Sequence, residues 1–169
     1  EGSAVDSTSI TGSNVTINGT TIVSSSSYGS DVGHVAVTND QDSSAYAKAK
    51  AINASSAGVK ANANATGVDN GAFATGTAYT LQINGTTIFQ SGEAATVEDL
   101  VNQVNLHSDE TGVTANVGGT SIQLSAQDGR NITVAAGGGA IQQGFAAATT
   151  RGTITLSDTD NITVGAGTS

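Results

Sequence analysis

The sequence predicts an α+β, β-rich fold made of two β-β-α-β repeat units followed by C-terminal β-hairpins. The first observation behind this prediction is the string Ile-Asn-Gly-Thr-Thr-Ile, which occurs at residues 17–22 and again at residues 83–88. The second is a Gly-Val-x-Ala-Asn string that follows each copy, at residues 58–62 and 112–116. The third is a stretch with helical periodicity between each pair of strings. Self-similarity of this kind indicates one structural unit used twice.

Each unit opens with a predicted hairpin. In the first copy, Val15 and Ile17 alternate with polar residues before the turn, and the second copy repeats this alternation. The dipeptide Asn-Gly supplies the two residues with positive φ that a type I′ turn requires. We therefore predict tight turns at the four motif residues Asn18, Gly19, Asn84 and Gly85.

The first unit continues with an alanine-rich helix predicted for residues 44–54, in which Lys48 and Lys50 are expected to be solvated. The residues predicted for its inner face are Tyr46, Ala49 and Ile52. Gly58 and Gly112 can end the helices of the two units in the left-handed conformation, after which each chain returns as a strand. The extra length of the first unit is assigned to a serine-rich loop that follows its hairpin.

The helix of the second unit is predicted to begin after Thr96. This residue is a candidate N-cap, and Asp99 takes the N3 position of a capping box. The apolar residues that follow recur at i, i+3, i+4 and i+7, which predicts one face packed on the hairpin. The residues of this face are Val97, Leu100, Val101 and Val104.

A weaker echo lies near the end of the chain, where residues 122–134 resemble residues 154–164. Both segments are predicted to be hairpins with acidic turns. Residues 67–76 carry many turn residues and few apolar ones, which favours a boundary there. We therefore predict a first sub-domain at residues 1–75 and a second, with the C-terminal hairpins, at residues 76–169.

Composition restricts the classes of partner. The 169-residue chain has 5 basic and 14 acidic residues, which give a net charge of −9. Phosphate backbones and anionic membranes would repel such a chain, so we expect neither nucleic acid nor a membrane as a partner. Cysteine is absent, which excludes disulfides and thiolate metal sites. The chain does not begin with methionine, and we expect it to be a piece of a longer protein.

No residue pattern predicts an enzyme, a cofactor or a metal site. His34 and His107 lack converging partners at ligand spacing, and neither an HExxH nor a G-x-S-x-G pattern occurs. Acidic strings at residues 39–42 and 158–161 offer oxygen atoms, but they do not match a calcium-binding EF-hand loop and are interpreted as turns. We expect a non-catalytic protein that uses no cofactor.

The order of the repeated strings resembles the flagellin hook IN motif, which is found in bacterial flagellins and in flagellar hook-associated and cap proteins. The resemblance covers residues 14–63 and 79–134, and the turn at residues 128–130 resembles the segment that often follows the motif in flagellins. It implies a structural outer domain on the surface of the extracellular flagellar filament, which contributes to filament surface properties, motility and antigenicity. Flagellins polymerise through long terminal helices that this sequence lacks. The resemblance therefore implies other flagellin subunits as partners and a monomeric isolated fragment.

Two alternatives stay open. The chain could be the outer domain of a flagellar hook-associated or cap protein, or an adhesive module that binds host glycan. Aromatic residues, which favour glycan binding, make up only 4% of the chain. The resemblance also implies O-glycosylation in the outer region, against the alternative of an unmodified flexible loop. The candidate residues are Ser24, Ser25, Ser26, Ser27 and Ser30.

Overall fold

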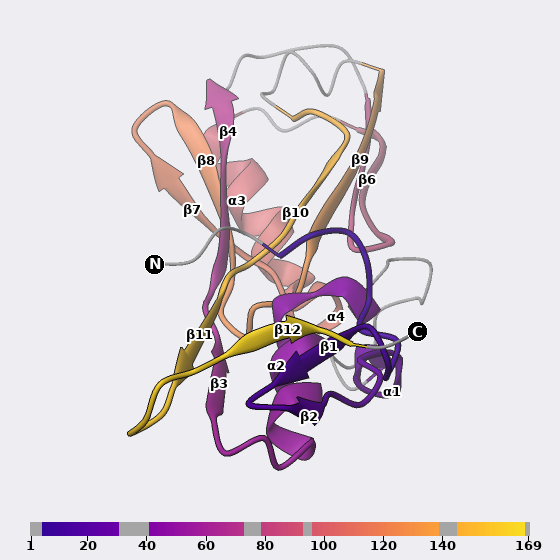
Figure 1. Ribbon diagram of the computed structural model, residues 1–169. Helices are drawn as coiled ribbons and strands as arrows, with labels where there is room; N and C mark the ends of the chain where they lie inside the picture. The colour runs from indigo at the N-terminus through magenta and orange to yellow at the C-terminus, as the bar shows by residue number, and fades with distance from the viewer. Residues whose placement is uncertain (1–4, 31–40, 73–78, 93–95, 139–144, 168–169) are drawn as a thin grey trace.

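The computed structural model describes residues 5–30, 41–72, 79–92, 96–138 and 145–167, and it has the predicted α+β, β-rich fold (Figure 1). The helical elements are α1 (Ser26–Gly29), the 3-10 helix η2 (Gln41–Ser43), α2 (Ala45–Ala54), α3 (Val97–Leu106) and α4 (Ser108–Thr111). The strands are β1 (Val15–Ile17), β2 (Thr20–Thr21), β3 (Lys60–Ala63), β4 (Thr66–Ala72), β5 (Tyr79–Ile83), β6 (Thr86–Gly92), β7 (Thr114–Gly118), β8 (Ser121–Ala126), β9 (Ile132–Gly138), β10 (Ala148–Thr150), β11 (Ile154–Ser157) and β12 (Val164–Ala166).

The chain forms two units, each with its own apolar core. The first unit contains β1, β2, α1, η2, α2 and β3, together with β11 and β12 from the end of the chain, and its core includes Ile17 and Ile22. The second unit contains β4 to β10, α3 and α4, and its core includes Leu81, Leu100 and Phe145. Figure 1 shows the sheets of the second unit above those of the first.

The second unit is an insertion in the first. β3 pairs antiparallel with β11, and β1 pairs antiparallel with β12, so that strands from both ends of the chain complete the first unit. The second unit has two sheets of its own, with strand orders β10-β9-β5-β6 and β4-β8-β7. The chain therefore leaves the first unit after β3, builds the second unit, and returns at β11.

The two units follow one plan in the same register. β1 pairs with β12 as β5 pairs with β9, and in both pairs the Ile of the Ile-Asn-Gly string lies opposite the Val of an Asn-Ile-Thr-Val string. β3 pairs with β11 as β7 pairs with β8, and the Ala of each Gly-Val-x-Ala-Asn string lies opposite a Leu. The matching pairs are Ile17 with Val164, Ile83 with Val134, Ala61 with Leu156 and Ala115 with Leu124.

The predicted pairing of the C-terminal hairpins is wrong. β8 and β9 are not bonded to each other, and neither are β11 and β12; the two strands of each pair belong to different sheets. Each strand instead pairs with a strand from earlier in the chain. Two short strands on their own would be marginally stable, whereas pairing with the earlier strands completes each unit. The echo noticed in the sequence is thus the closing pair of strands of each unit.

The predicted boundary also differs from the structure. Residues 66–72 form β4, which pairs with β8 in the second unit, so they are not a linker between sub-domains. β11 and β12, which were predicted for the second sub-domain, belong to the first unit instead. Turn-forming residues such as Asp69, Asn70 and Gly71 are accommodated because the register of β4 against β8 shifts between Asp69 and Ala72.

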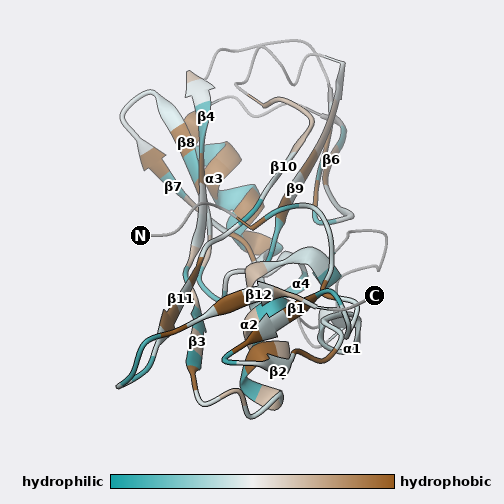
Figure 2. Ribbon diagram, viewed as in Figure 1, coloured by the Kyte–Doolittle hydropathy of each residue, from teal (hydrophilic) through white to brown (hydrophobic). Residues whose placement is uncertain are grey.

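The local elements agree closely with the sequence pattern. Ser44 and Thr96 are the N-caps of α2 and α3, and each hydroxyl accepts a hydrogen bond from the amide three residues on, at 3.1 Å in both cases. In α3, Leu100 and Val104 are fully buried, and Figure 2 shows apolar and polar residues alternating around this helix. α2 ends at Ala54, as predicted, and Gly58 and Gly112 have the positive φ angles expected of them, 77° and 66°.

One prediction about α2 is wrong, because Lys48 is buried while Lys50 is exposed as expected. The segment of residues 6–10 lies against this side of α2, and the Lys48 ammonium donates to the Asp6 carboxylate and carbonyl oxygen. The N-cap Ser44 corresponds to Thr96, so Lys48 occupies the position that Leu100 fills in α3. A cation in the first unit thus stands where the second unit has a core leucine.

Candidate functional site

The Asn of the second Ile-Asn-Gly string joins three segments of its unit. Asn84 and Gly85 have φ angles of 48° and 83°, as the predicted type I′ turn requires. The Asn84 side chain donates through Nδ2 to the Thr111 carbonyl oxygen at 2.9 Å and accepts through Oδ1 from the Thr133 amide at 2.8 Å. Its own amide donates to the Thr133 carbonyl oxygen at 2.8 Å. The turn is therefore bonded to both the end of α4 and β9.

The first unit repeats these bonds at Asn18. Asn18 and Gly19 have φ angles of 50° and 77°. The Asn18 side chain donates to the Ala57 carbonyl oxygen at 3.3 Å and accepts from the Thr163 amide at 2.9 Å. The two sites differ in burial, since Asn84 is fully buried and Asn18 is exposed. The predicted turns at the motif residues are confirmed. Each asparagine also bonds its turn to the last strand of its unit, which was not predicted from the sequence.

A second asparagine in each unit links the helix to the strand that follows. The Asn53 side chain in α2 donates to the Ala61 carbonyl oxygen and accepts from the Ala61 amide, both at 2.8 Å. The Asn105 side chain in α3 makes the same pair of bonds with Ala115, at 3.0 and 2.7 Å. The carboxamide groups of both asparagine side chains thus bond to a backbone N–H and C=O in the way that a neighbouring strand would. The buried Ala61 and Ala115 backbone groups therefore have partners without an additional strand.

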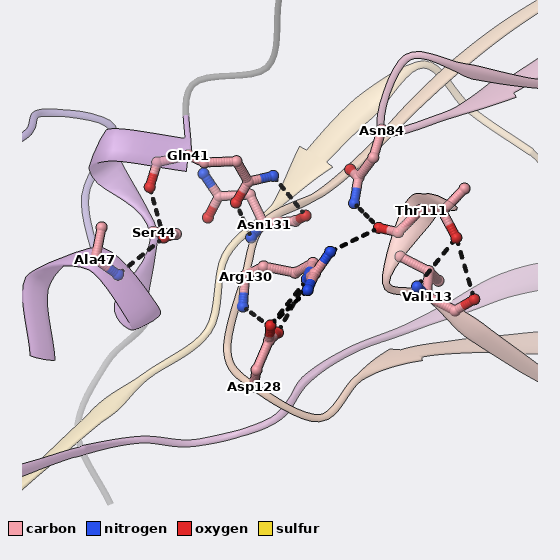
Figure 3. A network of polar contacts seen from close by, with 9 residues as sticks. All are labelled: Gln41, Ser44, Ala47, Asn84, Thr111, Val113, Asp128, Arg130 and Asn131. Atoms are coloured by element: carbon pink, nitrogen blue, oxygen red, sulfur yellow. Dashed lines mark hydrogen bonds and ion pairs between the residues drawn. The ribbon is translucent and has the colours of Figure 1, made fainter. Parts of the chain in front are cut away.

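A buried polar junction connects the two units (Figure 3). The Gln41 side chain, from η2 of the first unit, donates to the Asn131 carbonyl oxygen at 3.1 Å and accepts from the Asn131 amide at 2.9 Å. The Asn131 side chain donates to the Ser43 hydroxyl at 3.3 Å. The Tyr46 amide donates to the Gly129 carbonyl oxygen at 3.2 Å. The start of α2 is thus bonded to the turn that leads into β9.

Arg130 holds the same turn from the side of the second unit. Its guanidinium binds both carboxylate oxygens of Asp128, at 2.7 Å for the Nη2–Oδ2 contact, and its Nη1 donates to the Thr111 carbonyl oxygen at 3.2 Å. Gly112 has a φ angle of 66° and lies under the guanidinium, where a Cβ atom would approach Nη1 to 1.8 Å. The positive φ favours glycine at this position, and a Cβ atom would displace the guanidinium from its bonds to Asp128 and Thr111.

The serines proposed for glycosylation are not equivalent. Ser25 is fully buried; its hydroxyl accepts from the Ile10 amide at 2.9 Å and donates to the Asp42 carbonyl oxygen at 2.6 Å. A sugar cannot be attached there without opening the fold, so Ser25 leaves the candidate set. Ser24 is half-buried, whereas the remaining candidates Ser26, Ser27 and Ser30 are exposed on α1 and at its end.

The other polar candidates take structural positions. His107 caps the end of α3, and its Nδ1 lies 3.4 Å from the Glu110 carboxylate. Asp158 accepts from the Thr159 amide at 2.6 Å, as the predicted turn requires. His34 and residues 39–40 lie outside the described residues. Within the described ranges, no group of three or more His, Cys, Asp or Glu side chains could hold a metal ion, and no helix could span a membrane.

An open groove of about 410 Å³ lies in the first unit between β11, β12, β1 and the segment of residues 6–10. Its walls are largely apolar, and Lys48 contributes the cationic end. The Lys48 ammonium donates to the Asp6 carboxylate at 2.8 Å and to the Asp6 carbonyl oxygen at 3.2 Å. The ammonium, with the Thr8 hydroxyl, holds the pKa of the Asp6 carboxyl below its ordinary value of 3.8.

No protein-family model matches the chain, and no curated protein matches it. We therefore interpret three features from their geometry alone: the hydrogen bonds of the asparagine side chains, the polar junction between the units, and the groove. In the described part of the chain, the asparagine amides detailed above bind backbone groups, which stabilises the fold. The groove is a largely apolar concavity with a polar end, and such a lining is suited to binding a side chain or an extended segment.

Proposed function

We propose that this chain is the structural, surface-exposed outer domain of a bacterial flagellar filament subunit, without catalytic activity. The duplicated motif is the observation that supports this most. Its defining residues, the Asn of each Ile-Asn-Gly string and the Ala of each Gly-Val-x-Ala-Asn string, make the same hydrogen bonds in both units. These residues belong to the strings that carry the resemblance to the flagellin hook IN motif, and the side chains that make the bonds are those of asparagines.

The surface chemistry fits a domain that keeps filaments soluble and apart. Exposed carboxylates are spread over both units, at Asp6, Asp69, Glu98, Asp99, Asp109, Glu110, Asp158 and Asp160. With a net charge of −9, neighbouring filaments coated with this domain would repel one another at low ionic strength. The repulsion would weaken as the Debye length falls to about 8 Å at physiological salt.

The nested topology indicates how the proposed domain would be oriented on the filament. Both described ends of the chain lie in the first unit, where the Val5 amide donates to the Gly152 carbonyl oxygen and the Gly167 amide to that of Asn14, at 2.9 and 3.1 Å. If the polymerising helices flank this domain, the first unit lies near the filament core and the inserted second unit lies outermost. Antibodies and proteases would then reach the second unit first.

The direct test is intact-mass measurement and peptide mapping of the parent protein in filaments sheared from cells. Peptides of this chain as the dominant subunit would support the flagellin assignment. A few copies per filament would favour a hook-associated or cap protein instead. Their absence from filaments would refute the flagellar proposal. Added hexose-type mass confined to peptides with Ser24, Ser26, Ser27 or Ser30, and absent from Ser25, would establish O-glycosylation at the accessible hydroxyls.

A further inference from the structure

The second unit shows how the apolar face of this fold is covered. β10 pairs antiparallel with β9 and lies beside β4, which pairs with β8 (Figure 1). Phe145, three residues before β10, is buried in the core with only 1% of its surface exposed. Beneath these segments, Leu124 and Val134 are 1% and 6% exposed. Two added strands and one aromatic side chain thus close this unit.

The first unit has the same face without this cover. In the described part of the chain, β12, the counterpart of β9, is an edge strand, and β11, the counterpart of β8, pairs with β3 alone. Val164, which corresponds to Val134, is 62% exposed, and Leu156, which corresponds to Leu124, is only half-buried. Figure 2 shows apolar stretches on both strands. The residues that line the open groove include Lys48, Leu156 and Val164, whose counterparts in the second unit are the buried Leu100, Leu124 and Val134.

The segment of residues 6–10 covers part of this face but does not close it. Ile10 enters the core of the first unit, and Asp6 pairs with Lys48 at the position of Leu100. At one end of the face, the ion pair of Lys48 with Asp6 thus replaces a core leucine. The groove of about 410 Å³ remains although residues 6–10 form part of its wall. The core of the second unit, by comparison, buries one aromatic side chain, that of Phe145.

We propose that this groove binds an extended segment of a partner protein, which pairs antiparallel with the free edge of β12 and inserts one large apolar side chain. Strand addition at an exposed edge combines backbone hydrogen bonds with a pocket for a side chain. The segment resembles residues 145–151 in chemistry: an aromatic residue, small and hydroxylated residues, and a terminal cation.

Charge decides between such a partner and a second copy of this chain. The Asp6 side chain is 73% exposed at the rim, Asp158 and Asp160 are exposed on the adjoining turn, and the whole chain carries −9. A second copy would bring the same negative charge to this surface, whereas a neutral or basic segment would be attracted to it. This inference does not depend on the flagellar proposal, since it follows from the internal comparison of the two units.

The test uses a blocked synthetic peptide with the sequence of residues 145–151, Phe-Ala-Ala-Ala-Thr-Thr-Arg, titrated into the whole chain and followed by NMR. We expect saturable shifts of Val164, Leu156 and Ile154 signals at peptide concentrations below about 1 mM. A peptide with alanine in place of the phenylalanine is expected to bind at least about tenfold more weakly, because the apolar side chain supplies the main buried area. No binding of the phenylalanine peptide at this concentration would overturn the proposal.

Two matched variants locate the binding site. Val164→Glu places a like charge at the mouth of the groove and is expected to weaken peptide binding at least about tenfold. Val117→Glu changes an exposed valine on β7 of the second unit, 41% exposed, and is expected to leave binding unchanged. Circular dichroism checks that both variants fold. Binding that survives Val164→Glu would refute the groove as the site, and self-association abolished by Val164→Glu in sedimentation would instead identify a second copy as the occupant.

Discussion

Asn84→Ala perturbs the shared hydrogen-bond pattern most severely, because it removes both side-chain bonds from a fully buried position. The Thr133 amide loses its bond to Oδ1 at 2.8 Å, and the Thr111 carbonyl oxygen loses the bond from Nδ2 at 2.9 Å but keeps the one from Arg130 at 3.2 Å. Asn18→Ala removes the corresponding bonds to Ala57 and Thr163, at an exposed residue where water can take their place. The difference between the two variants in the free energy of unfolding therefore measures how much burial strengthens the same set of hydrogen bonds.

The expected costs differ by a factor of two or more. At Asn84, the loss of the Thr133 amide's partner costs about 1–3 kcal/mol and the loss of one of the two bonds to the Thr111 carbonyl oxygen about 0.5–1.5 kcal/mol. Alanine with positive φ adds about 1–2 kcal/mol, so the free energy of unfolding should fall by at least about 2.5 kcal/mol. At Asn18, only the conformational cost of about 1–2 kcal/mol is expected. Asn84→Gly and Asn18→Gly keep the positive φ and isolate the side-chain bonds.

Urea unfolding followed by far-UV circular dichroism gives the free energies, with the slope m as a check that the same surface is exposed in each variant. Hydrogen exchange provides a local measurement, since the Thr133 amide should lose protection in Asn84→Gly and the Thr163 amide should change little in Asn18→Gly. If the two alanine variants differ by less than about 0.5 kcal/mol, burial does not set the strength of these bonds, and the reasoning is refuted.

Two further predictions concern single positions. Gly112→Ala should destabilise the chain by at least about 2 kcal/mol more than Gly58→Ala, because both have positive φ but only the former brings a Cβ to 1.8 Å from the Arg130 guanidinium; equal losses in urea unfolding would contradict this. Lys48→Leu should leave stability at neutral pH within about 1 kcal/mol, because a core leucine replaces the ion pair, as in the second unit. The lowered pKa of Asp6 means that its pairing with Lys48 stabilises the fold above pH 3.8 and is lost as the pH falls through the lowered pKa, so the melting temperature of Lys48→Leu should lack this acid-dependent component.

Sequence reasoning succeeded where the signals are local. Asn-Gly between alternating apolar residues specified both turns. The candidate N-cap Thr96 placed the start of α3, and the alanine-rich stretch from residue 44 placed that of α2. These elements depend on interactions within a few residues, which a linear pattern contains. The exposed position of Lys50 likewise followed from the pattern, whereas that of Lys48 depended on a carboxylate 42 residues away.

Sequence reasoning failed where partners are distant along the chain. The Asn-Ile-Thr-Val strings at residues 131–134 and 161–164 were visible, but adjacency along the chain favoured local hairpins. The structure joins each string to an Ile-Asn-Gly string instead, across 49 residues in the Thr133–Asn84 bond and 145 in the Thr163–Asn18 bond. A signal existed all the same. The Ile-Asn-Gly, Gly-Val-x-Ala-Asn and Asn-Ile-Thr-Val strings each occur twice, which predicts that one unit contains one copy of each. Because the second copies of the first two strings are followed directly by residues 131–134, these three form one continuous unit, and residues 161–164 are left to complete the first.

The nested duplication also explains how a chain with few large apolar residues can fold. In each unit, asparagine side chains form hydrogen bonds with backbone groups next to the turn and after the helix. These bonds add to the few backbone hydrogen bonds that strands of three to five residues can make. Satisfied buried polar groups specify one arrangement more sharply than a small apolar core can. One difference between the two units concerns this core: the second unit has a leucine, a phenylalanine and two covering strands, whereas the first has Lys48 and an open groove. The closed unit shows that this plan can bury the corresponding face, and the open groove is the surface on which we propose that a partner segment binds.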